Sequence, residues 1–175
     1  MTVSPATGRG GHDPGEPDRP ETGPPDRTAT GRSDDLGPVP APGGTVVEVR
    51  VAAQADQVPI VRTVAAEVAA RADFDLDSIS DLRMAVDEVC ATLVGLAAPG
   101  AALRCVFAVD PDRIQVAVTA PPRRPGAVFD TGGFGWRVLQ TLVDEVVSQS
   151  GADPARDGER HTELGIRFTK KALRG

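Results

Sequence analysis

The clearest pattern of hydrophobic and polar positions lies in residues 75–96. Six apolar residues recur there at steps of three and four and would form one stripe along a helix: Ile79, Leu82, Val86, Val89, Leu93 and Leu96. Asp77 precedes the stripe and is predicted to cap the helix by accepting hydrogen bonds from its free N–H groups. Pro99 and Gly100 should end it, because proline cannot continue a helix and glycine adopts the turn readily.

Two further helices are predicted, one before and one after this segment. Asp56 can cap the first, Pro59 falls in its first turn, and its apolar residues lead to about Arg71: Val61, Val64, Ala65 and Val68. Another follows a glycine-rich turn and covers residues 136–143. Directly before this last helix, a loop rich in proline and glycine runs from residue 121 to about 133.

Alternating apolar and polar residues predict five strands, at residues 45–52, 103–109, 114–119, 145–150 and 164–168. The residues between the second and third strand, 110–113, are typical of a hairpin turn. The order strand, helix, helix, hairpin, loop, helix, strand, strand predicts an α/β (α+β) two-layer sandwich. Its single sheet would be mixed but mostly antiparallel, with the helices on one face.

The first 44 residues differ from the rest in composition. They are dense in Pro, Gly, Asp, Arg and Thr and carry few large apolar residues, so we expect residues 1–44 to be a disordered tail and residues 45–175 to form one domain. The tail lacks the basic start and apolar core of a signal peptide, and no segment approaches the ~20 apolar residues of a membrane span. A cytoplasmic protein that is not embedded in a membrane is therefore expected.

Charge, cysteines and histidines exclude several kinds of site. The net charge of −6 and the isoelectric point near 4.9 argue against nucleic acid as a direct partner. Cys90 and Cys105 have no metal-binding spacing and are expected to be buried free thiols. His12 and His161 stand alone, so no metal-binding cluster is visible.

Two segments carry a resemblance to a known family. The segment LRMAVDEVCATLV, residues 82–94, resembles the N-box helix of the Bergerat-fold (GHKL) ATPases, in the version found in bacterial anti-sigma factors that are also serine-protein kinases. Residues 133–136, Gly-Phe-Gly-Trp, resemble the glycine-rich turn of the same family, and the apolar residues that follow resemble the helix behind it. The resemblance covers the chain from about Val46 onward and implies the two-layer sandwich described above.

The resemblance also implies site residues for ATP and Mg²⁺. Glu88 matches the catalytic base, and Thr92 stands where the family has the metal-binding asparagine, so Thr92 is a candidate nucleotide contact and a weak Mg²⁺ ligand. The phosphates would lie against Gly132, Gly133 and Gly135, whose N–H groups and following helix can face an anion.

One part of the family's pattern is absent. The family places Asp-x-Gly-x-Gly after the strand at 114–119, and its aspartate reads the adenine amino group. This chain has Ala120-Pro121-Pro122 there, and the nearest acid, Asp130, is expected on the far side of the loop. Together with Thr92, this loss makes a degenerate ATP site the preferred interpretation and leaves enzymatic activity open.

Three functions fit these residues. The preferred one is an anti-sigma factor that binds an alternative sigma factor and is released by an anti-anti-sigma antagonist. The second is the same regulator acting as an ATP-dependent serine kinase on that antagonist. The third, an ATPase module of a sensor histidine kinase, is disfavoured because no helical hairpin with a phosphoacceptor histidine precedes the domain. The resemblance further implies a homodimer.

Arg62 is the candidate contact for the partner. It matches an arginine of related anti-sigma factors that meets both sigma factor and antagonist. It also falls off the apolar stripe of its helix, so we expect it to project outward with all five N–H donors free. A guanidinium in that position can form a two-pronged pair with a partner's carboxylate.

Overall fold

The computed structural model describes residues 44–150 and 163–172, all within one compact unit of the chain. His12, His161 and the proposed tail up to residue 43 lie outside these residues. No helix of the described residues is long and apolar enough to cross a membrane. The elements are, in order, β1 (Thr45–Ala52), a 3₁₀ turn (Ala55–Gln57), α1 (Val58–Arg71), α2 (Leu76–Leu96), β2 (Ala102–Asp110), β3 (Arg113–Ala120), α3 (Phe134–Leu142), β4 (Glu145–Ser150) and β5 (Leu164–Lys171).

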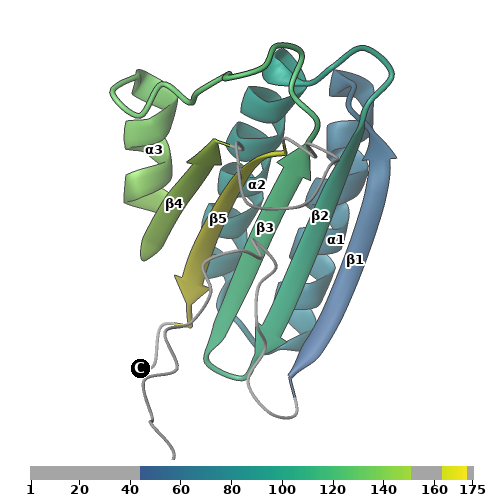
Figure 1. Cartoon of the computed structure of the whole chain (residues 1–175). Helices are drawn as coiled ribbons and strands as arrows, with labels where there is room; N and C mark the ends of the chain where they lie inside the picture. Colours follow the sequence, from purple (N-terminus) through teal and green to yellow (C-terminus); the bar gives the residue numbers. More distant parts are fainter. Residues whose placement is uncertain (1–43, 151–162, 173–175) are drawn as a thin grey trace, which may run out of the picture. The chain divides into compact units, whose positions relative to one another are not determined.

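The strands form one five-stranded sheet in the order β1-β2-β3-β5-β4. All four neighbouring pairs are antiparallel, so the sheet is not mixed as expected. Helices α1 and α2 lie side by side across one face of the sheet, and α3 lies on the other side of α2, near β4 (Figure 1). The predicted two-layer α/β sandwich with its helices on one face is confirmed.

Helix α2 lies at the centre of the core. Leu82, Val86, Val89 and Leu93 are fully buried, as the periodicity predicts, whereas Ile79 and Leu96 at the two ends are only partly buried. They pack against the alternate residues of the strands that face the helices: Leu103, Cys105, Phe107, Ile114, Val116, Val118, Leu164, Ile166 and Phe168. Helix α2 contacts α1 along one flank and α3 along the other.

The helix starts differ from the predicted ones. Asp75, not Asp77, caps α2: its carboxylate accepts from the N–H of Ser78 at 2.8 Å and from the Ser78 hydroxyl at 2.6 Å. These hydrogen bonds hold the pKa of Asp75 below its ordinary value. Asp56 falls in the 3₁₀ turn, so α1 starts after it without a side-chain cap. Helix α3 starts at residue 134, two residues earlier than predicted.

The two cysteines face each other across the interface between α2 and β2. Cys90 and Cys105 are both fully buried free thiols, as predicted. The hydrogen bond between them and their burial raise the pKa of Cys90 far above its usual range. A thiol held in its protonated form is a poor nucleophile, so these residues contribute to packing.

The mostly buried side chain of Lys170, on β5, contacts both α2 and α3. The Lys170 ammonium of β5 donates to Asp81 of α2 at 2.7 Å and to the carbonyl oxygen of Leu142, the last residue of α3, at 3.1 Å. Its side chain is only 12% exposed. A cation at the C-terminus of α3 also interacts favourably with the helix dipole.

We therefore expect Lys170→Met to lower the free energy of unfolding by about 1–2 kcal/mol, because a partly buried ion pair and a helix-end contact are lost together. The neighbouring Lys171 is 56% exposed and 3.7 Å from Glu145, so Lys171→Met should change stability by less than about 0.5 kcal/mol. Urea denaturation of both variants measures the difference. Equal losses would show that the buried contacts of Lys170 add nothing.

Candidate functional site

Glu88 and Thr92 lie one turn apart on the flank of α2 that faces α3, and both are half-buried. The Thr92 hydroxyl donates to the carbonyl oxygen of Glu88 at 2.8 Å. A threonine that bonds its own helix in this way keeps its side chain close to the backbone. The two residues therefore share a face as predicted, but Thr92 does not extend outward as a longer amide would.

The Glu88 carboxylate reaches across to the first turn of α3. A side chain at Gly135 would displace the Glu88 carboxylate, because a Cβ atom there would collide with Glu88 Oε1 and lie 3.0 Å from Glu88 Cδ. Glu88 forms neither a side-chain hydrogen bond nor an ion pair with any described residue. The structure thus brings together Glu88 and Gly135, two candidates 47 residues apart in the sequence.

The glycine turn is organised by Asp130, which precedes Gly132 by two residues in the sequence. Asp130 Oδ1 accepts from the N–H of Gly132 at 3.1 Å, and its backbone oxygen accepts from Gly133 at 3.3 Å. A Cβ atom at Gly133 would lie 2.7 Å from Asp130 Oδ2. Gly133 then caps α3 through its backbone alone. The three glycines therefore form a tight turn with one carboxylate on either side.

At the other end of the site, the loop after β3 is fastened to the end of α2. The N–H of Ala98 donates to the carbonyl of Pro121 at 2.9 Å, and the N–H of Arg123 donates to the carbonyl of Leu96 at 2.7 Å. The Arg123 Nε donates in addition to the carbonyl of Ala97, at 3.3 Å. A chain segment that pairs with the helix end in this way presents no side-chain acid to an adenine amino group.

The described residues do not by themselves form a complete set of ligands for a magnesium ion. Mg²⁺ needs several oxygen ligands in an octahedral arrangement, usually including carboxylates. No group of three or more His, Cys, Asp or Glu side chains within residues 44–150 and 163–172 is arranged to hold a metal ion. The hydroxyl of Thr92 already donates to its own helix. Glu88, one turn away on the same face of α2, is the carboxylate that could share a metal with Thr92, so waters and phosphate oxygens would have to supply the remaining ligands.

Arg62 lies on α1, against the flank of α2 opposite to Glu88, and is not free, which corrects the sequence expectation. Its NH1 lies 3.1 Å from Asp87 Oδ2, and the side chains of Arg62 and Asp87 are 35% and 36% exposed. The other oxygen, Asp87 Oδ1, is buried and accepts no hydrogen bond from the described residues. Sequence reasoning missed Asp87, because nothing in its spacing from Arg62 signals that α1 and α2 pack at this level.

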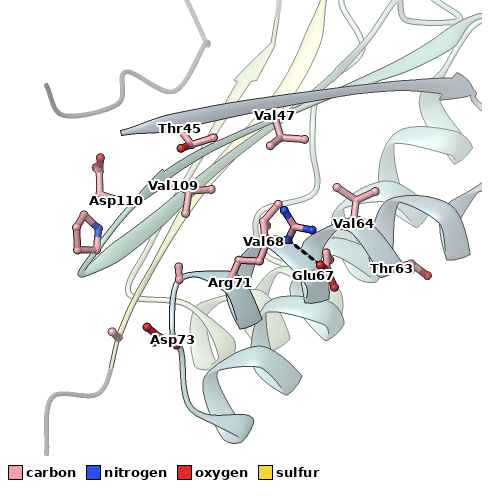
Figure 2. A pocket seen from close by; sticks show the side chains of 13 residues that line it. Thr45, Val47, Thr63, Val64, Glu67, Val68, Arg71, Asp73, Val109 and Asp110 are labelled. Atoms are coloured by element: carbon pink, nitrogen blue, oxygen red, sulfur yellow. Dashed lines mark hydrogen bonds and ion pairs between the residues drawn. The ribbon is translucent and has the colours of Figure 1, made fainter. Parts of the chain in front are cut away.

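A cavity in the described part of the chain is separate from these residues. It has a volume of about 1030 Å³ and lies between α1 and the start of β1 (Figure 2). Its apolar lining consists of Val47, Val64, Val68 and Val109. The ion pair of Glu67 with Arg71, at 2.7 Å, lies at its rim. The other lining residues are Thr45, Thr63, Ala72, Asp73, Asp110, Pro111 and Ala172. The register of the sheet places this cavity at the end opposite the loop after β3.

Comparison with known proteins agrees with this geometry. Residues 51–164 match the model of the histidine kinase-like ATPase domain. The anti-sigma-F factor RsbW of Mycobacterium tuberculosis is 40% identical over 135 residues, which cover 74% of this chain and 75% of the relative. The serine-protein kinase RsbW of Bacillus subtilis is 31% identical over 124 residues, which cover 59% of this chain and 78% of the relative.

A solved structure, the mycobacterial sensor histidine kinase MprB, aligns with a TM-score of 0.43 and 15% identity over 71% of this chain and 98% of that one. Both the family model and the mycobacterial relative span most of the described residues. This chain therefore belongs to the anti-sigma factor and serine-protein kinase family, whose members carry a histidine kinase-like ATPase domain.

Proposed function

We propose that this chain is an anti-sigma factor that binds an alternative sigma factor, is released by an anti-anti-sigma antagonist, and carries a degenerate ATP site. The name of the mycobacterial relative, anti-sigma-F factor, supports the first part. The observation that supports the second part is the segment Ala120-Pro121-Pro122, which carries no acid and whose two prolines are paired with the end of α2. A shared fold does not establish a shared activity when the residues of the site are missing.

Domains of this type bind ATP, usually with Mg²⁺, and such a site needs both a metal position and an adenine contact. Here Thr92 replaces the amide and its hydroxyl is bonded to the helix backbone. Ala120 offers a methyl group where an acceptor for the adenine amine is required. A buried donor left without its acceptor costs about 1–3 kcal/mol. These two losses favour a protein-binding role over phosphoryl transfer.

The alternative is an active serine-protein kinase that phosphorylates the antagonist. Glu88 and the turn formed by Gly132, Gly133 and Gly135 support it, since a base and an anion-binding turn are both retained. The Bacillus relatives bear the name serine-protein kinase. Incubation of this chain with its antagonist and radiolabelled Mg-ATP separates the two functions: the proposal expects no labelled antagonist, and stoichiometric labelling would establish the kinase.

Arg62 is the proposed contact with the sigma factor. Its single contact with Asp87 leaves N–H donors of the guanidinium available, and the pair is half-exposed rather than sealed in the core. A half-exposed ion pair contributes only about 0–1 kcal/mol, so a partner carboxylate can share or take over this guanidinium. A two-pronged pair at the centre of an interface is worth more.

A homodimer is proposed through β1. Within the described residues β1 pairs on one side only, which leaves an edge strand of eight residues. If two copies pair antiparallel about Val49, Glu48 of one copy faces Arg50 of the other, twice across the two-fold axis. Hydrogen bonds from Arg104 and Arg50 hold the pKa of Glu48 below its ordinary value, so this carboxylate is charged at neutral pH.

Arg50→Glu should therefore weaken the dimer at least tenfold, because each pair of opposite charges becomes a pair of like charges. Analytical ultracentrifugation measures the dissociation constant. Arg71→Glu is the matched control, since it makes the same charge change at another exposed position. A dimer of unchanged strength in Arg50→Glu would place the interface elsewhere.

A further inference from the structure

Helix α3 lacks an anion of its own at its start. Gly133 caps it without a side chain, and its first turn contains no acidic residue. The first N–H groups of a helix have no partner within the helix, and the helix dipole places about half a positive charge there. The start of α3 is therefore stabilised only by negative charge supplied from outside the helix.

Glu88 of α2 supplies such a charge. Its Oε1 fills the space that a side chain at Gly135 would occupy, so the carboxylate lies directly against the second residue of α3. Asp130, in the loop before the turn, supplies another through its contact with Gly132. Glu88 differs from Asp130 in that it joins two helices far apart in the sequence and has no other charged partner among the described residues.

We propose that Glu88 is a positioning residue whose carboxylate occupies the place of a phosphate group at the start of α3 and holds the glycine turn closed without nucleotide. This inference concerns the degenerate site of the proposed function but rests on the contact between Glu88 and Gly135. A phosphate group that approached this turn would meet a carboxylate of the same charge and would have to displace it. The missing side chain at Gly135 then leaves space for the Glu88 carboxylate rather than for a nucleotide.

A double-mutant cycle on the full chain tests the contact. In the wild type, Gly135→Ala should lower the melting temperature by about 3 °C or more, because the new methyl group collides with Glu88. In Glu88→Ala the same change should be neutral or stabilising, since alanine is favoured over glycine in a helix. Gly133→Ala is the control: its collision is with Asp130, so its effect should be equal in both backgrounds. Equal losses for Gly135→Ala in both backgrounds would overturn the proposal.

Inorganic phosphate provides the second test, at constant ionic strength against chloride. Phosphate should raise the melting temperature of Glu88→Ala by about 2 °C or more, because the vacated turn can bind it, and should leave the wild type unchanged. Equal shifts in the two proteins, including no shift in either, would show that Glu88 does not occupy a phosphate position. Both tests follow the unfolding of the chain alone, so their failure is distinct from a failure to bind a sigma factor.

Discussion

Arg62→Ala is expected to weaken the complex with the sigma factor at least tenfold, which corresponds to about 1.4 kcal/mol. The guanidinium can form a two-pronged hydrogen bond with a partner's carboxylate, and truncation removes it entirely. The melting temperature should change little, because the lost ion pair with Asp87 is half-exposed. Isothermal titration calorimetry against the sigma factor gives the dissociation constant.

Two variants make this result specific. Arg62→Lys should recover only part of the affinity, since an ammonium cannot donate two parallel hydrogen bonds. Arg71→Ala is the matched control: Arg71 lies on the same helix, forms its own ion pair with Glu67 and is 78% exposed, so its loss should leave binding unchanged. If Arg62→Ala binds as tightly as the wild type, the contact lies elsewhere on the surface.

The isolated chain should bind Mg-ATP with a dissociation constant above about 1 mM, which is at least about 1,000-fold weaker than a site of about 1 μM and corresponds to at least about 4.1 kcal/mol. An adenine amine bound as the family pattern implies would meet Ala120 instead of a carboxylate, and Thr92 cannot complete a metal site by itself. Calorimetric titration with and without Mg²⁺ measures this affinity.

Thr92→Asn alone should improve ATP binding by less than about threefold, because it repairs the metal position and leaves the adenine contact missing. The fastening of Pro121 and Arg123 to the end of α2 would also remain. Micromolar, Mg²⁺-dependent affinity in the wild type would overturn the degenerate site and favour the kinase.

Most of the fold could be predicted because its signals are local. The stripe of Leu82, Val86, Val89 and Leu93 and the alternation in the strands each depend on neighbours a few residues away. Helix caps were less certain, since Asp75 and Asp77 both precede the stripe and only the backbone geometry selects Asp75. The mixed sheet was wrong because pairing direction depends on the path of the chain between strands.

The contacts between the site residues could not be predicted from the sequence. The family pattern marked Glu88 and Gly135, but their direct contact depends on how α2 and α3 pack. The hydrogen bonds of Asp130 to the glycine turn depend on the backbone course of the loop, which cannot be read from composition. Arg62 was expected to be free, since its partner Asp87 lies 25 residues further along the chain on another helix.

One measurement tests the central claim directly: titration of the purified full chain with its sigma factor in Mg-ATP, in Mg-ADP and in chelator without nucleotide. An anti-sigma factor with a degenerate ATP site should bind with the same dissociation constant in all three, within about threefold, or about 0.7 kcal/mol. Binding that requires Mg²⁺ and nucleotide would contradict the degenerate site. No binding to any sigma factor under any of the three conditions would contradict the function itself.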